Sequence, residues 1–147
     1  IQGQYFLGRS GFGVSGSFTK VYCDVDVDIL SDPGSNVFAL VGLADSFNLT
    51  AIYDRGGISA RIAYNWRDKF LSGVAQIVGV GALPVYTRAY GWLDASLSYR
   101  FSDKLSIVIA GTNLLGTMRS SYYGVETRPQ SNWIGDRQVS LTLSARF

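Results

Sequence analysis

The chain has 147 residues, of which 47% are hydrophobic, 14% aromatic and only 16% charged, and its formal net charge is +2. The charged share is below the roughly 25% of an average soluble domain. Lys and Arg are scattered singly, which excludes a nucleic-acid-binding patch. The lack of histidine excludes Ser-His-Asp and Cys-His catalysis and histidine-ligated metals, so we expect neither an enzyme nor a bound cofactor.

The apolar residues do not form membrane-spanning helices. The longest apolar runs, residues 37–44 and 74–85, fall short of the roughly 18 residues that a transmembrane helix requires. The chain begins at Ile1 and shows no signal peptide, so we expect a mature form or a fragment of a longer protein. Its single cysteine, Cys23, permits no internal disulfide.

Alternation of polar and apolar residues predicts β-strands along most of the chain. The last segment is the most regular, because every residue from Gln138 to Phe147 alternates in polarity. A partial strand is expected at the beginning of the chain. The strands are predicted at residues 1–6, 12–18, 46–54, 58–67, 92–101, 105–115 and 138–147.

Short and long connections alternate between these strands. The short ones, residues 7–11, 55–57 and 102–104, contain Gly or Asp and predict hairpin turns. The long ones are residues 24–45, 71–88 and 116–136. In an up-and-down meander, alternate connections lie at the same end. Short turns on one rim and long loops on the other are typical of outer-membrane barrels.

Aromatic residues concentrate near both ends of the apolar face. Such rows predict two membrane girdles that contact outer-membrane lipid, with the polar face turned to a wet lumen. The row near the short turns comprises Phe12, Tyr53, Tyr99, Phe101 and Phe147, and the row near the long loops comprises Phe18, Phe47, Tyr64 and Trp66.

A terminal strand ending in Phe147 resembles the signal that the barrel assembly machinery of the bacterial outer membrane reads. Three stretches in order resemble the C-terminal end of a TonB-dependent receptor: SFNLTAIYDRGGISARIAYNWRDKFL, YGWLDASLSYRFSDKLSIVIAGTNLLG and GDRQVSLTLSARF. The resemblance covers most of the chain, from about residue 11 to residue 147.

The resemblance implies an all-β fold of antiparallel up-and-down transmembrane strands. Residues 1–147 would form the last six or seven strands of a larger barrel of about 22 strands. The plug domain and the segment that binds the TonB complex would lie in a missing N-terminal part. The intact protein is then expected in the bacterial outer membrane, where it takes up a scarce ligand, such as a siderophore or carbohydrate, with TonB-coupled energy.

Two groups of residues are candidates for binding an unknown small-molecule ligand. The cations Arg67, Arg88 and Arg119 could attract an anion, or instead form ion pairs in the lumen. Exposed aromatic rings could stack on a ligand, or instead serve as a membrane anchor at Trp92 and as loop packing at the other positions. These aromatic candidates are Trp92, Tyr122, Tyr123 and Trp133.

The acidic run Asp24, Asp26 and Asp28 places three carboxylates on one side of an extended segment. Calcium prefers oxygen ligands, but the run lacks the Gly and Glu spacing of a calcium loop. We therefore expect a solvated strand extension rather than a metal site.

Two other functions remain open at this stage. The length also suits a complete eight-stranded outer-membrane barrel with a structural or adhesive role. A soluble β-barrel binding module would instead bury the apolar face in a core. The mass of the native protein and its solubility without detergent distinguish these alternatives. We also expect the isolated chain not to fold alone, because an open sheet leaves unpaired edges in lipid.

Overall fold

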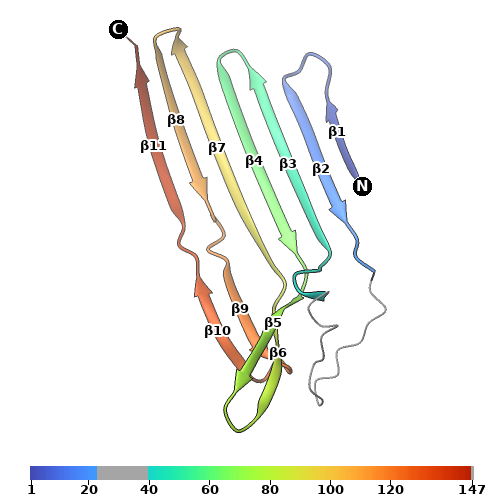
Figure 1. Cartoon of the computed structure of the whole chain (residues 1–147). Coiled ribbons are helices and arrows are strands. Elements are labelled where there is room, and N and C mark those ends of the chain that lie inside the picture. Colours follow the sequence, from blue (N-terminus) through green and yellow to red (C-terminus); the bar gives the residue numbers. More distant parts are fainter. Residues whose placement is uncertain (23–39, 147) are drawn as a thin grey trace.

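A computed structural model of the chain describes residues 1–22 and 40–146. The described residues form an all-β fold, in which seven strands make one antiparallel sheet that we call the wall (Figure 1). The strands of the wall follow one another across the sheet in chain order. They are β1 (Gln2–Phe6), β2 (Phe12–Thr19), β3 (Ser46–Arg55), β4 (Ile58–Arg67), β7 (Tyr90–Ser102), β8 (Leu105–Thr112) and β11 (Gln138–Ala145).

The pairing register gathers the apolar residues on one face of the wall. Residues directly opposite each other on antiparallel strands point to the same side of the sheet. One row across the middle illustrates this, and all its members are apolar: Val14, Ala51, Ile62, Ala95, Gly111 and Val139. The predicted alternation of polar and apolar faces is therefore confirmed in this sheet, and Leu105, Ile107 and Ile109 share the apolar face of β8.

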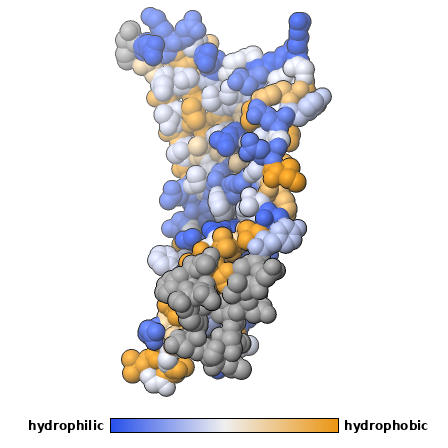
Figure 2. Space-filling view, turned by 45° about the vertical axis from the view of Figure 1, so that its right-hand side comes forward, coloured by the Kyte–Doolittle hydropathy of each residue, from blue (hydrophilic) through white to orange (hydrophobic). Residues whose placement is uncertain are grey.

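Within the described part of the chain, no second layer covers this apolar face. On β11, the side chains of Leu141 and Leu143 are 68% and 66% exposed. Figure 2 shows hydrophobic side chains at the surface next to hydrophilic ones. A helix that could cross a membrane is not found in the described residues.

The connections sort between the two ends of the wall as predicted. The tight turns between β1 and β2, β3 and β4, and β7 and β8 lie at one end, together with the C-terminus (Figure 1). The connections from β4 to β7 and from β8 to β11 lie at the other end (Figure 1). Most of the third long connection, residues 24–45, lies outside the described residues.

Two of the three long connections are not loops, which corrects the sequence prediction. Residues 71–88 contain most of β5 (Phe70–Ile77) and all of β6 (Gly81–Thr87). Residues 116–136 contain β9 (Met118–Tyr123) and β10 (Pro129–Ile134). Each pair forms a hairpin, and β6 pairs with β9, so the four strands form a second sheet in the order β10-β9-β6-β5. This small sheet extends beyond the wall (Figure 1).

The small sheet holds most of the buried apolar side chains. Leu71, Pro84, Val85 and Tyr122 are buried there, whereas Ala63 is the buried apolar residue of the wall. At the tip of the β5–β6 hairpin, by contrast, the apolar residues Val78 and Val80 are exposed. This tip forms the hydrophobic lower end of the molecule in Figure 2.

Aromatic contacts occur near both ends of the apolar face. At the short-turn end, the ring centroids of Phe12 and Tyr53 lie 4.6 Å apart, as do those of Tyr99 and Phe101. At the other end, the ring of Phe47 lies 5.7 Å from that of Tyr64 and 5.5 Å from that of Trp66. Members of both predicted rows therefore contact one another, although Phe18 takes part in none of these ring contacts. Phe147 lies outside the described residues.

The turn between β1 and β2 yields a test of the fold. Gly11 has a φ of +87°, and an added Cβ would lie 2.8 Å from the carbonyl oxygen of Asp54. We expect Gly11→Ala to lower the free energy of unfolding of the protein by about 1–3 kcal/mol. The measurement is the shift of the midpoint of unfolding in urea.

Gly8→Ala is the matched control, because Gly8 also has a positive φ but an added Cβ would meet nothing within 4 Å. Gly8→Ala should lower the free energy of unfolding by less, because it adds backbone strain but no close contact. Equal losses for the two variants would show that the close approach to Asp54 contributes nothing.

Candidate functional site

A groove lies where the wall passes into the small sheet. It has a volume of about 340 Å³, which is at the small end of the roughly 300–1,000 Å³ of ligand sites. Five segments contribute to it: β7, the β8–β9 connection, β9, β10 and the β10–β11 connection. The lining residues are Tyr90, Trp92, Asn113, Thr117, Arg119, Trp133, Ile134 and Gly135.

Aromatic rings line the groove from two sheets. On β7, Tyr90 lies opposite Arg67 and Trp92 lies opposite Asn65, so both rings share the polar face of the wall. Their centroids are 5.7 Å apart and the rings are stacked. Trp133 comes from the edge strand β10, opposite Arg119 on β9, and is 67% exposed. The groove therefore opens on the face that carries the polar side chains.

Asn113 holds the segments around the groove together. Its backbone adopts a φ of +50°, a region that Asn tolerates better than most residues, and this ends β8 at Thr112. Its side-chain amide donates to the carbonyl oxygens of Gly135, at 2.8 Å, and Thr117, at 3.3 Å. Its side-chain oxygen accepts the N–H of Thr117, and its backbone N–H donates to Asp94 on β7, both at 2.9 Å.

Arg119 brings a positive charge to this aromatic surface. Its guanidinium lies 5.7 Å from the ring centroid of Tyr90, in a cation–π contact. No carboxylate lies within ion-pair distance of Arg119 among residues 1–22 and 40–146. Three of the predicted ligand-binding residues thus meet in one place: Trp92, Arg119 and Trp133.

Arg88 and Tyr122 belong to a separate cluster within the small sheet. The guanidinium of Arg88 contacts the Glu126 carboxylate at 2.6 Å and lies 5.2 Å from the Tyr122 ring centroid. Tyr122 is 3% exposed and stacks on Tyr86 at 5.6 Å. Burial, together with the charge of Glu126, raises the pKa of Tyr122. This cluster packs the small sheet and leaves the Tyr122 ring inaccessible.

The remaining candidates also have structural contacts. The Arg67 guanidinium donates to the carbonyl oxygen of Gly42 and lies 4.0 Å from the ring centroid of Phe70. Tyr123 ends β9, where its backbone N–H donates to the carbonyl oxygen of Arg128 at 2.9 Å. The structure does not bring either residue to the groove.

The acidic candidates Asp24, Asp26 and Asp28 lie outside the described residues. Elsewhere in the described chain, no three His, Cys, Asp or Glu side chains gather in a way that could hold a metal ion.

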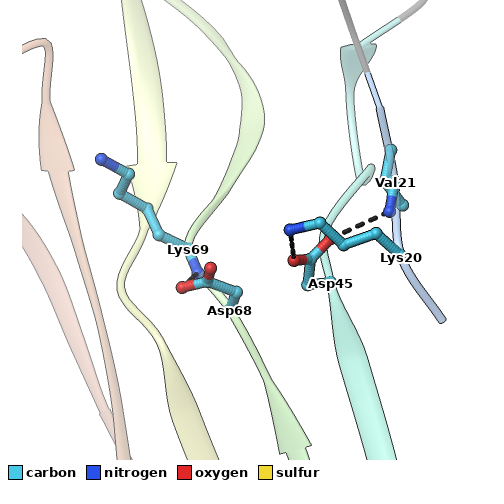
Figure 3. A network of polar contacts seen from close by, with 5 residues as sticks. All are labelled: Lys20, Val21, Asp45, Asp68 and Lys69. Carbon is cyan, nitrogen blue, oxygen red and sulfur yellow. Dashed lines mark hydrogen bonds and ion pairs between the residues drawn. The ribbon is translucent and has the colours of Figure 1, made fainter. Parts of the chain in front are cut away.

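A polar clasp joins three strands at the long-connection end of the wall (Figure 3). The Asp45 carboxylate contacts the Lys20 ammonium at 2.5 Å and accepts the backbone N–H of Val21 at 2.9 Å. The backbone N–H of Asp68 donates to the carbonyl oxygen of Asp45 at 2.9 Å. The end of β2, the start of β3 and the end of β4 are thereby held together.

Sequence reasoning missed Tyr90, Asn113 and Thr117 at the groove. Tyr90 lies two residues before the start of the strand predicted at residues 92–101, and its stacking on Trp92 depends on β7 beginning at Tyr90. Asn113 falls inside the strand predicted at residues 105–115, although Gly116 directly after that strand is a turn signal.

Comparisons with known proteins found no matching family model, no matching curated protein and no matching solved structure.

The clasp predicts a pH dependence. Hydrogen bonds from Lys20 and from the Val21 N–H lower the pKa of Asp45 from its ordinary value of 3.8. Its stabilising contribution is therefore present above about pH 4 and is lost as the pH falls through the lowered pKa. The hydrogen bond to Asp45 raises the pKa of Lys20, so the contribution of Lys20 to stability is lost only in strong alkali. We expect the hydrogen-exchange protection of the Val21 amide to fall between pH 4 and pH 2.

Asp45→Asn keeps an acceptor for Val21 but cannot titrate, so its Val21 protection should not change over this pH range. Asp68→Asn is the matched control, because the Asp68 carboxylate accepts the Lys69 N–H instead and should leave the Val21 profile as in the native protein. A native profile that is flat down to pH 2 would contradict the role of Asp45.

Proposed function

We propose that the wall is part of the transmembrane β-barrel of a TonB-dependent receptor in the bacterial outer membrane. One observation carries the proposal: a continuous apolar face without a covering layer in the described residues, with aromatic clusters at both ends. Lipid is the solvent that such a face requires, and aromatic residues concentrate at the two membrane interfaces. The polar face would then line a lumen.

The edges of the wall support a larger barrel. Within the described chain, β1 and β11 each pair with one neighbour and leave their outer edges open. An unsatisfied backbone group in the hydrocarbon region costs several kcal/mol, so membrane-spanning sheets close into barrels. Further strands from a longer polypeptide would pair with both edges and close the barrel. The plug and the TonB-binding segment would belong to the same longer polypeptide.

The resemblance of the strands to TonB-dependent receptors supports energy-coupled uptake of a scarce ligand. The groove lies at the long-connection end of the polar face, where a ligand entering the lumen from outside would pass. The strand β11 would be the segment that the barrel assembly machinery reads.

The native mass tests the proposal. An antibody to residues 138–147 would detect the polypeptide in an outer-membrane fraction. A receptor should give a band several times heavier than the 16.0 kDa of this chain. A band at that mass would instead indicate a small self-contained barrel, and absence from the membrane fraction would indicate a soluble binding module.

Adjacent residues on β7 test which face meets lipid. Leu97 lies on the apolar face between Ala60 and Ile109, whereas Ser98 lies on the polar face between Ser59 and Val108. We expect Leu97→Arg to destabilise the full-length protein in lipid vesicles by about 2–4 kcal/mol, because Arg is costly near the bilayer midplane.

Ser98→Arg is the matched control and should change the free energy of unfolding by less than about 1 kcal/mol, because lumen positions are wet. If Ser98→Arg were as destabilising as Leu97→Arg, the assignment of the lipid face would be wrong.

A further inference from the structure

The polar groups that line the groove are not equally available. The side-chain amide of Asn113 is engaged on both its oxygen and its nitrogen, by Thr117 and Gly135. The hydroxyl proton of Thr117 is donated to the carbonyl oxygen of Gly91 at 2.5 Å. These groups build the floor of the groove, so a ligand must be recognised mainly by the other side chains.

The groups that remain are chiefly hydrogen-bond donors. The indole N–H groups of Trp92 and Trp133 donate only, and the Arg119 guanidinium offers five N–H donors and no acceptor. Within the described chain these three groups have no side-chain hydrogen-bond partner. Neither Asp nor Glu lines the groove, and the hydroxyl oxygens of Tyr90 and Thr117 are the side-chain acceptors left. The groove therefore matches a ligand that accepts hydrogen bonds.

The shape and charge of the groove narrow the ligand further. Stacked rings on β7 and an exposed indole on β10 offer flat apolar surface, on which another planar ring can stack. Arg119 contributes a single positive charge, and a guanidinium pairs with a carboxylate in a bidentate geometry. A phosphate monoester carries about −1.5 to −2 charges at pH 7, which one Arg does not neutralise.

We propose that the groove between β7, β9 and β10 binds an aromatic carboxylate, with its ring against Tyr90, Trp92 and Trp133 and its carboxylate on Arg119. This deepens the proposed uptake function and rests on it for the source of the ligand. A neutral sugar fits less well, because its hydroxyl groups donate as well as accept. The groove offers few hydrogen-bond acceptors to these donating hydroxyl groups, and a buried donor without an acceptor costs about 1–3 kcal/mol.

The test measures binding to the full-length protein in detergent by titration calorimetry. The probes are 2-naphthoate, its neutral analogue 2-naphthamide, and maltose. We expect naphthoate to bind about tenfold or more tightly than naphthamide, because a hydrogen bond to a charged group is the stronger one. The difference should shrink as salt is added, because the groove is partly open to solvent.

Arg119→Gln should weaken naphthoate binding about tenfold to a hundredfold and leave naphthamide binding nearly unchanged. Arg119→Lys keeps the charge but loses the bidentate geometry of the guanidinium. Its affinity for naphthoate should therefore lie between that of the native protein and that of Arg119→Gln. Arg128→Gln is the matched control, because Arg128 is also exposed, in the turn between β9 and β10, but does not line the groove. Heat-modifiable gel mobility checks that each variant is folded.

Equal binding of naphthoate and naphthamide, tighter binding of maltose, or no binding of any probe would overturn the proposal. An equal effect of Arg128→Gln would overturn it as well. The mass of the native polypeptide, measured as described for the proposed function, shows whether only the aromatic-carboxylate proposal fails or the uptake function fails as well. A heavy outer-membrane polypeptide that binds only maltose keeps the receptor and rejects the aromatic carboxylate. A polypeptide of 16.0 kDa that binds naphthoate keeps the groove and rejects the receptor.

Discussion

The apolar face of the wall is the constraint on which the rest of the structure depends. Its side chains follow from strict alternation in the sequence, and the register aligns them strand by strand from β2 to β11. A globular domain would cover such a face with a second layer, because burying apolar surface stabilises a fold by about 25 cal/mol per Å². In the described residues the small sheet does not do this, since it continues beyond the end of the wall instead of lying across it (Figure 1).

The wall could be predicted from the sequence because one rule governs most of it, although a register shift interrupts β7 between Arg100 and Ser102. Where each strand has one apolar and one polar face, a period of two locates the strand and also fixes its register. The small sheet follows that rule poorly. Register shifts interrupt β5 between Leu71 and Gly73 and β10 between Pro129 and Ser131, and Pro84 stands inside β6. Its strands therefore resemble loops in sequence, and only the pairing of β6 with the distant β9 makes them a sheet.

The candidate site was also predictable only in part: some of its residues could be named from the sequence, but their meeting in one groove could not. Trp92, Arg119 and Trp133 could be singled out because aromatic rings in or near the long connections can stack on a ligand and a cation there can attract an anion. Their convergence could not be predicted, because it depends on β9 and β10 forming a hairpin and on Asn113 adopting a positive φ. Tyr122 shows the opposite outcome. It is also aromatic and lies in the same long connection as Trp133, but it stacks on Tyr86 and is buried in the small sheet.

The separation of the two sheets has an evolutionary consequence. The tips of the β5–β6 and β9–β10 hairpins take part in no pairing of the wall, and at the first tip Val78 is fully exposed. Doubling the length of such a loop costs only about 0.6 kcal/mol in closure entropy. The short turns have no such freedom, since Gly11 packs directly against Asp54. Insertions and deletions should therefore accumulate at one end of the molecule, where they change the small sheet while the strands of the wall are inherited unchanged.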